Sequence, residues 1–320
     1  MSRVLLGLIS AVLVFAVSGC AGLAAGAESG SAAKSGKQAR AQQPKPTKPP
    51  IRIGDLLGTD GRLTVLILGS DARDGVIGAR TDAIIVATIN PKSGKVAMVS
   101  LPRDTVNVPI APGRTYSGRI NSLFWEYERS TGKAKTALKK TKKAMAYAFG
   151  TEIDYYALVE FDGLVRLINR IGGIDVRLKE ALSDPTMHLG KKGLRLKAGK
   201  RHLDGKTALA FSRTRHSDSD YGRSRRQQQV LTAAAAKVRE RGSDKLSALV
   251  DIARKKIITD MPLRAAPALL ELAGVARLHN VKSVVLEPGR WARQLPGTYV
   301  ITPRVAEVHK LFDRFFKPVG

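Results

Sequence analysis

Acidic and basic side chains gather at two places in the chain where they could bind a metal ion and phosphate. The first lies beside a predicted β-hairpin, residues 83–89 and 96–101, joined by a turn rich in Pro and Gly. Counted from the centre of that turn, Asp82 and Arg103 are equally distant. We therefore expect them to be cross-strand neighbours.

Asp71 and Arg80 extend this first cluster. Asp71 follows the continuous apolar run 63–68, which predicts a strand buried on both faces. If that strand runs parallel to residues 96–101, its carboxyl end reaches the same sheet edge, where open α/β sheets bind ligands. Two carboxylates beside Arg80 and Arg103 suit Mg²⁺ and phosphate, because Mg²⁺ completes its shell with phosphate oxygens and water. A surface ion-pair network is the alternative.

The second cluster, residues 213–227, leads into a predicted helix that Asp218 or Asp220 would cap. Three side chains would share one face of its first turns: Arg223, Arg226 and Gln227. A helix N-terminus favours anions, and one Arg side chain can donate two parallel hydrogen bonds to phosphate oxygens. The segment therefore predicts a diphosphate site. A solvated basic face is the alternative, although Arg213 and Arg215 directly follow an apolar segment.

Composition narrows the function further. The 320 residues include 54 Lys and Arg against 27 Asp and Glu, a net charge of +27, and 43% are hydrophobic. Such a chain buries a core and needs an anionic partner: nucleic acid, a membrane surface or substrate phosphates. One cysteine excludes an intramolecular disulfide and the Cys-rich zinc sites. Residues 199–207 resemble a phosphate-binding P-loop but have five residues between the glycines instead of four.

The N-terminus predicts export. Residues 1–19 form a signal peptide or membrane anchor, with an apolar run at 4–17 that is shorter than the ~20 residues of a membrane span. Cys20 follows Val-Ser-Gly and resembles the lipidated cysteine of bacterial lipoproteins. An uncleaved anchor extending through residues 21–27 is the alternative. Both place the protein on the outer face of the cytoplasmic membrane, where neither nucleic acid nor ATP is an expected partner.

The elements that must position these residues belong to a single domain. Residues 20–54 predict a lipidated, disordered tether rich in Ala, Gly, Ser, Lys and Pro, and residues 55–320 one folded unit. Further strands are expected at 155–159 and 174–176. Helices are expected at 134–149, 163–171 capped by Asp162, 206–211, 221–241, 244–256, and 303–316 capped by Thr302. This mixed order predicts an α/β/α layered domain with a mixed central sheet.

In their order, these segments resemble the LytR-CpsA-Psr family of Gram-positive bacteria. The resemblance spans residues 62–240 and rests on motifs at 66–71, 80–82, 100–104, 119–121, 172–176, 203–210 and 213–227. It implies a phosphotransferase that moves a glycopolymer-1-phosphate from a polyprenyl diphosphate carrier to a peptidoglycan hydroxyl. The polymer could be a teichoic acid, an arabinogalactan or a capsule. The lipoprotein-like Cys20 departs from the family, which more often has a transmembrane anchor.

The resemblance also implies residue roles. Asp71 and Asp82 would hold Mg²⁺, and six side chains would bind the diphosphate: Arg80, Arg103, Arg213, Arg215, Arg223 and Gln227. Asp71, Asp218 and Asp220 are candidate bases for the acceptor hydroxyl, and Phe124 and Trp125 either pack or line a lipid groove. Two other functions stay open: a hydrolase that splits the lipid diphosphate with water, and a non-catalytic surface lipoprotein that binds polyanions.

Overall fold

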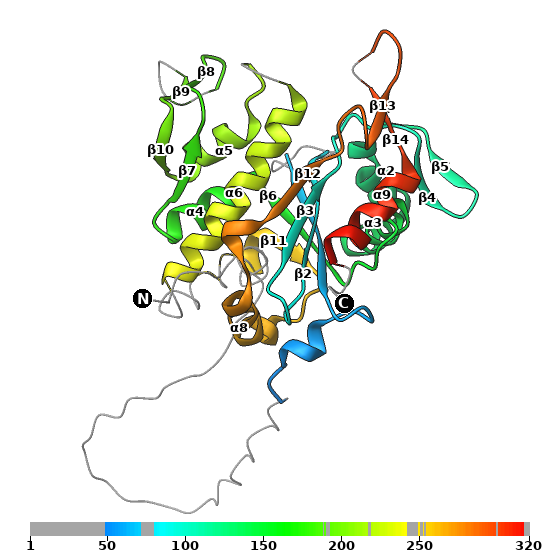
Figure 1. Ribbon diagram of the computed structural model, residues 1–320, viewed down its shortest axis with the longest axis horizontal. Helices are drawn as coiled ribbons and strands as arrows, with labels where there is room; N and C mark the ends of the chain where they lie inside the picture. The colour runs from blue at the N-terminus through cyan, green and yellow to red at the C-terminus, as the bar shows by residue number, and fades with distance from the viewer. Residues whose placement is uncertain are drawn as a thin grey trace, which may run out of the picture.

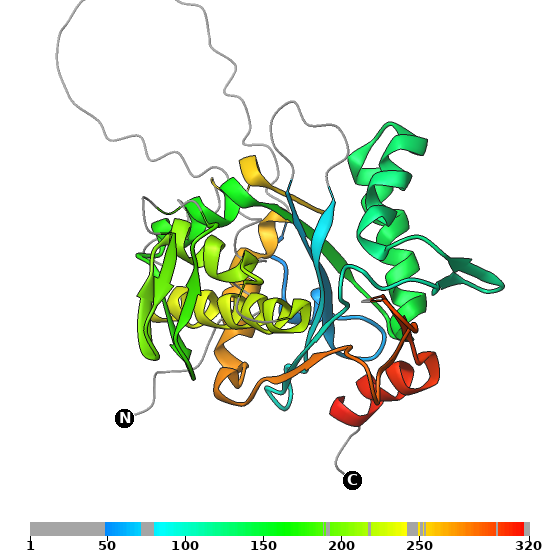
Figure 2. The same ribbon diagram turned by 90° about the horizontal axis from the view of Figure 1, so that it is seen from above.

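A six-stranded mixed sheet crosses the middle of the molecule, with helices on both faces (Figures 1 and 2). The computed structural model describes residues 49–71, 80–187, 189, 193–216, 219–241, 249, 252, 254–298 and 300–316. The predicted α/β/α layering and the mixed sheet are confirmed. The predicted signal peptide, residues 1–19, and Cys20 lie outside the described residues. Within those ranges, no helix is long and apolar enough to cross a bilayer.

The sheet places the residues of the first charged cluster at one edge. Its strands in spatial order are β11 (Ile257–Thr259), β6 (Tyr155–Glu160), β1 (Leu63–Ser70), β2 (Thr81–Ile89), β3 (Val96–Ser100) and β12 (Lys282–Val285). β2 is antiparallel to both β1 and β3, so β1 and β3 run in the same direction, as predicted. β6 and β12 add parallel strands at either side. The ends of β1 and β3 therefore meet the start of β2 at one edge.

Helices cover both faces because the central strands are apolar on both sides. One face packs against α2 (Leu123–Thr131), α3 (Ala134–Phe149) and α9 (Val305–Phe316). The other face packs against α4 (Phe161–Arg170), α5 (Gly205–Arg213), α6 (Asp220–Arg241) and α8 (Ala266–Val275). Each layer has its own hydrophobic cluster. The site described below lies between the sheet and the second group of helices.

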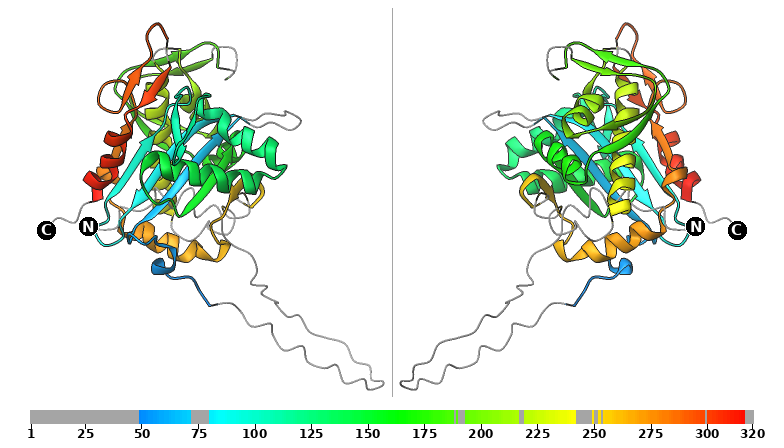
Figure 3. Two further views of the ribbon diagram at one scale, coloured as in Figure 1. Left: turned by 90° about the vertical axis from the view of Figure 1, so that its right-hand side faces the viewer. Right: turned by 90° about the vertical axis from the view of Figure 1, so that its left-hand side faces the viewer.

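Short strands and 3-10 turns connect these layers. The two-stranded ladders join β4 (Val108–Ala111) to β5 (Arg114–Tyr116), β7 (Ile174–Leu178) to β10 (Gly199–Leu203), β8 (Leu182–Asp184) to β9 (Leu194–Leu196), and β13 (Ala292–Gln294) to β14 (Ile301–Pro303). The 3-10 turns are η2 (Ile53–Leu56), η3 (Ile120–Ser122), η5 (Leu263–Ala265) and η6 (Leu278–Asn280). Near the first described residues, Ile51 and Ile53 pack against the core. Figure 3 shows this blue segment beside α8.

The C-terminal part of the chain is tied to the helix that carries the second charged cluster. Gln228, on α6, is 2% exposed. Its side-chain amide donates to Ser100 Oγ on β3 at 2.7 Å and to the backbone oxygen of Val284 on β12 at 2.9 Å. One buried amide thus connects the helix to two neighbouring strands.

Three predicted helix caps were wrong. Asp220 is the first residue of α6 and not its cap, because Ser219 Oγ accepts the N–H of Gly222 at 3.3 Å. Glu160, not Asp162, occupies the N-cap position of α4, and Asp162 lies in the first turn, where it pairs with Arg166 and Lys256. At the last helix, Thr302 and Pro303 belong to β14, because they pair with β13. That helix begins at Val305. The predicted 134–149 helix is found with the same bounds, and most of the predicted 244–256 helix lies outside the described residues.

Asp154, at the sheet edge opposite the charged clusters, should make stability depend on pH. Burial is the main cause that raises the pKa of Asp154 to about 6. The backbone N–H of Thr64 donates to the carboxylate and lowers the pKa, but by less. Above pH 6 the folded protein carries a partly buried ionised carboxylate, so stability falls as pH rises through this value. Asp154→Asn should therefore be more stable than the wild type at pH 8, by about 1 kcal/mol after solvent screening.

Thermal melts between pH 4 and 8 test this. The advantage of Asp154→Asn should shrink as the pH falls toward 4, because Asp154 is then protonated in the folded protein and about half protonated in the unfolded chain, where its pKa is the ordinary 3.8. Asp162→Asn is the control: Arg166 and Lys256 lower the pKa of Asp162, so this variant should gain nothing at any pH. A difference between Asp154→Asn and wild type that stays constant with pH would contradict the assignment.

Candidate active site

A pocket of about 500 Å³ lies between the sheet and helices α4 and α6. Its lining changes character along α6, from Arg223 and Gln227 in the first turns to Val230, Leu231 and Ala234 in the later ones. β2 shows the same change over three residues, from Asp82 to Ile85. The pocket therefore has a charged end at the sheet edge and an apolar end beneath the sheet.

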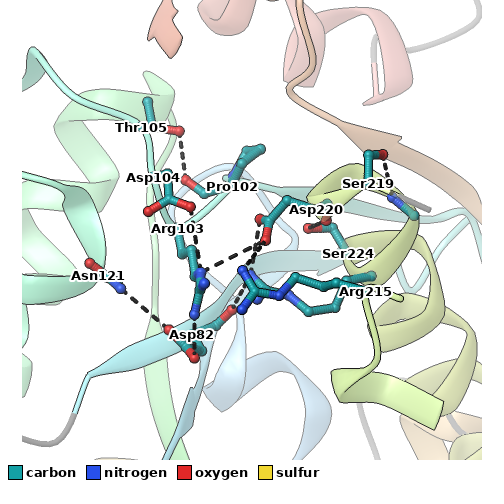
Figure 4. Close-up of polar contacts among 12 residues, drawn as sticks. Asp82, Pro102, Arg103, Asp104, Thr105, Asn121, Arg215, Ser219, Asp220 and Ser224 are labelled. Carbon is teal, nitrogen blue, oxygen red and sulfur yellow. Dashed lines mark hydrogen bonds and ion pairs between the residues drawn. The ribbon is translucent and has the colours of Figure 1, made fainter. Parts of the chain in front are cut away.

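The charged end brings together residues from both sequence clusters (Figure 4). Arg103 Nη1 donates to Asp82 Oδ2 at 2.8 Å, which confirms the cross-strand pairing predicted from the hairpin. On its other side, Arg103 Nε lies 3.7 Å from Asp220 Oδ1. Asp220 also pairs with Arg215 at 3.6 Å and with Arg223 at 3.0 Å. One carboxylate thus lies among three guanidinium groups.

Arg223 is the most deeply placed of these cations. Its side chain is 4% exposed, and burial is the main cause that lowers its pKa to about 10, so it stays charged at neutral pH. Two N–H groups at this end, Arg103 Nε and Arg223 Nε, are buried without a hydrogen-bond partner in the described part of the chain. Buried donors are normally satisfied. Arg103 Nε faces the carboxylates of Asp220 and Asp104 at 3.7 and 3.6 Å, so Arg223 Nε is the donor of the two that is left for an anion.

Asp220 is the acidic side chain most affected by this environment. Burial raises its pKa above the usual aspartate range, more than the neighbouring Arg223 and Arg103 lower it, and the nearby Asp104 adds to the rise. Its Oδ1 is buried and accepts no hydrogen bond in the described chain. A carboxylate with a raised pKa can accept a proton near neutral pH more readily than an ordinary aspartate.

The other predicted site residues divide into two groups. Arg213 lines the pocket with its guanidinium 4.6 Å from the ring centre of Phe161, and Arg215 and Gln227 also line it. Asp71 and Arg80 do not line it. They lie beside each other where β1 ends and β2 begins, and Asp71 Oδ1 accepts the backbone N–H of Arg80 at 2.9 Å.

Asp71 and Asp82 offer carboxylate oxygens, which are ligands that magnesium prefers. Both are carboxylates at one sheet edge, and magnesium uses one or two carboxylates together with phosphate oxygens and water. Across the described ranges, no group of three or more His, Cys, Asp and Glu residues could hold a metal by itself. These residues therefore suit a cation that binds together with a phosphate substrate.

Arg226 was predicted on the same face as Arg223 and Gln227, and the structure places it elsewhere. Its Nε donates to the backbone oxygen of Phe211 at 2.9 Å, and its Nη2 donates to that of Thr214. Helix α5 ends nearby with free carbonyl groups that attract a guanidinium. Arg226 therefore binds backbone and does not line the pocket. Asp218, the other candidate cap and base, lies outside the described residues.

The sequence analysis gave no role to some neighbours of the site, although they lie in the motifs at 100–104 and 119–121. Asp104 lies 3.6 Å from Arg103 and 3.1 Å from Arg119, and Asn121 donates to Asp82 at 3.3 Å. The position of Asp104, directly after Arg103 at the end of β3, was the available indication. The apolar end of the pocket was also missed. Phe124 does not line a lipid groove, because it is 2% exposed in the core on the opposite face of the sheet.

Comparison with known proteins identifies the family. The profile of the LytR_cpsA_psr family matches residues 23–314. The chain belongs to this family. The LytR-CpsA-Psr assignment covers nearly all of the described fold, so the two charged clusters and the pocket that joins them lie inside the family domain.

Named relatives agree with this assignment. A protein of Oceanobacillus iheyensis named polyisoprenyl-teichoic acid–peptidoglycan teichoic acid transferase TagU is 32% identical over 240 residues, covering 73% of this chain and 70% of that protein. The Bacillus subtilis transferase TagV is 30% identical over 197 residues, covering 60% of this chain and 48% of that protein.

Solved structures share the fold. The crystal structure of B. subtilis TagV superposes with a TM-score of 0.63 at 24% identity, covering 81% of this chain and 97% of that one. The structure titled TagT bound to LIIa-WTA superposes with a TM-score of 0.61 at 26% identity, covering 87% and 96%.

The arginine cluster predicts a measurable effect of Asp220. Its carboxylate competes with any anion for Arg103, Arg215 and Arg223, so Asp220→Asn should bind pyrophosphate about fivefold more tightly, roughly 1 kcal/mol. Calorimetric titration of both proteins with pyrophosphate and MgCl₂ measures this. Weaker binding by the variant would mean that Asp220 holds the arginines in place more than it repels the ligand.

Proposed function

We propose that this LytR-CpsA-Psr protein is a phosphotransferase that moves a glycopolymer-1-phosphate from a polyprenyl diphosphate carrier to a peptidoglycan hydroxyl. The substrate has a diphosphate with an apolar chain on one side and a sugar polymer on the other. The observation that carries the proposal is the single pocket with guanidinium groups at one end and aliphatic side chains at the other. A water-soluble diphosphate would not need the apolar end.

The names of the relatives support the same chemistry. TagU and TagV are named as transferases of teichoic acid from a polyisoprenyl carrier to peptidoglycan. A teichoic acid is therefore one polymer that this chain could transfer. The polyprenyl chain would contact the apolar lining of the pocket, which includes Ile67, Ile85, Leu164, Leu167, Val230 and Leu231.

In the proposed reaction, the acceptor hydroxyl oxygen attacks the phosphorus that bears the sugar polymer. A new P–O bond forms, the bond to the bridging oxygen breaks, and polyprenyl monophosphate leaves. Arg103, Arg215 and Arg223 would stabilise the negative charge that develops on the leaving phosphate. The hydroxyl proton would pass to Asp220, whose raised pKa suits it better for this role than an ordinary surface aspartate.

Asp71 and Asp82 would hold Mg²⁺ in this proposal. When bound, the ion would supply positive charge beside the phosphate oxygens. The protein's own contribution is to keep both carboxylates at the sheet edge, Asp71 through the backbone N–H of Arg80 and Asp82 through Arg103 and Asn121.

The proposal includes a location outside the cell. The apolar segment at residues 4–17 and Cys20 in a lipoprotein-like setting support export and a lipid anchor, or an uncleaved membrane helix. The remaining tether would keep the domain close to its membrane-bound substrate.

Arg215→Ala should lower transfer at least 100-fold without changing the melting temperature, because it removes one charged donor from a half-exposed position. Arg225→Ala is the matched control. Arg225 lies on α6 with a similar side-chain exposure, 54% against 48%, and pairs with Glu287 away from the pocket. Transfer is measured by mass spectrometry, using a short synthetic lipid-diphosphate glycan, MgCl₂ and peptidoglycan fragments.

Equal activity of the two variants would argue against the arginine site. The same assay separates the other functions. Release of glycan phosphate without an acceptor would indicate a hydrolase. Salt-sensitive binding without any product, and with no dependence on Arg215, would indicate a polyanion-binding protein.

Magnesium removal is a separate test. EDTA should stop transfer, and added MgCl₂ should restore it. Asp82→Asn should raise the MgCl₂ concentration needed for half-maximal activity roughly tenfold, since it removes a charged ligand. Asp104→Asn, which also loses a contact to Arg103, should leave that midpoint unchanged. A shared shift in both variants would show that Asp82 acts through Arg103 and not through a metal ion.

A further inference from the structure

Two pocket arginines flank a residue that is entirely buried. Thr214 is 0% exposed, whereas its neighbours Arg213 and Arg215 both line the pocket. Helix α5 ends at Arg213, and the backbone leaves the helical conformation at Thr214, with φ −57° and ψ 145°. The position of Thr214 therefore sets where the two arginines beside it begin.

Every polar group of Thr214 forms a hydrogen bond to another group of the protein. Its N–H donates to Ala210 O at 3.0 Å, and its carbonyl oxygen accepts from Arg226 Nη2. Its hydroxyl donates to Asp184 Oδ2. Asp184 is itself 1% exposed, and its other oxygen accepts from the backbone and side chain of Thr186 at 2.9 and 2.6 Å.

Charge accounts for the strength of this arrangement. Burial disfavours the ionised form of Asp184, but the hydrogen bonds from Thr186 and Thr214 outweigh it, so the pKa of Asp184 lies below its usual range. The carboxylate therefore stays ionised and holds the Thr214 hydroxyl by a charge-assisted bond. Arg226, which binds the carbonyl oxygen of Thr214, also donates from its Nε to the backbone oxygen of Phe211 at 2.9 Å.

We propose that Asp184 and Arg226 are positioning residues that act through Thr214 to fix Arg213 and Arg215 for the diphosphate. Arg226 does not line the pocket. Asp184 does line it, but both of its oxygens are already occupied by Thr186 and Thr214. The proposal rests on the proposed function, because the diphosphate is the ligand that a fixed pair of guanidinium groups would bind. Small displacements of binding groups lower affinity and rate by large factors. The hydrogen bonds that fix Thr214 therefore affect how well Arg213 and Arg215 bind the diphosphate.

The test uses Thr214→Val, which keeps the shape and removes the hydroxyl, and Thr214→Ser, which restores it. Binding of geranylgeranyl diphosphate with MgCl₂ is measured by calorimetry. Thr214→Val should bind roughly tenfold more weakly, and Thr214→Ser within twofold of the wild type. Thr88→Val is the matched control: Thr88 is also 0% exposed and bonds to Thr64 at 2.8 Å, in the sheet core. It should bind like the wild type.

Geranylgeranyl monophosphate distinguishes positioning from general damage. A collapsed pocket would weaken both ligands equally, whereas misplaced arginines weaken the diphosphate more. If Thr214→Val does not fold, Arg226→Lys serves instead, because lysine cannot bond both carbonyl groups with a planar fork, and it should show the same selective loss. Wild-type affinity in a folded Thr214→Val, or an equal loss in Thr88→Val, would overturn the proposal. A wild type that binds no diphosphate would overturn the proposed function as well.

Discussion

The structure of the site depends on the cost of placing three guanidinium groups close together, one of them almost fully buried. Arg223 is almost fully buried, and Arg103 and Arg215 lie near it. Without compensating charge, such an arrangement would be unfavourable. Asp220 supplies that charge from the start of the same helix as Arg223. The protein thus keeps an anion of its own at the place where the proposed substrate's phosphates would bind.

Two layers of the fold meet at this point. The antiparallel strands β1, β2 and β3 bring Asp71, Asp82 and Arg103 to one edge of the sheet. Helix α6 approaches the same edge with its N-terminus and continues beneath the sheet, where its aliphatic side chains line the apolar end of the pocket. One helix therefore contributes to both chemical environments.

Local geometry decides which parts could be predicted from sequence. The pairing of Asp82 with Arg103 follows from counting residues outward from a turn, and it is found. Helical spacing placed Arg226 with Arg223, but spacing does not reveal which neighbour competes for a side chain. The carbonyl groups at the end of α5 bind Arg226 instead. Likewise Thr302 and Pro303 have the composition of a helix start, yet strand pairing with β13 outweighs that preference. The apolar end of the pocket has no local pattern, because strands and helices far apart in the chain line it.

The connection made by Gln228 has a consequence for how the protein is assembled. Its amide needs an oxygen from Val284, on a strand that is made long after the charged clusters. A chain that emerges N-terminus first holds all the arginines of the site before β12 exists. Until that strand joins β3, the Gln228 amide lacks one acceptor and one side of the sheet stays unpaired. Nascent chains and products truncated before residue 282 would thus carry the full set of charged groups on an incomplete support, exposed to non-native β-pairing.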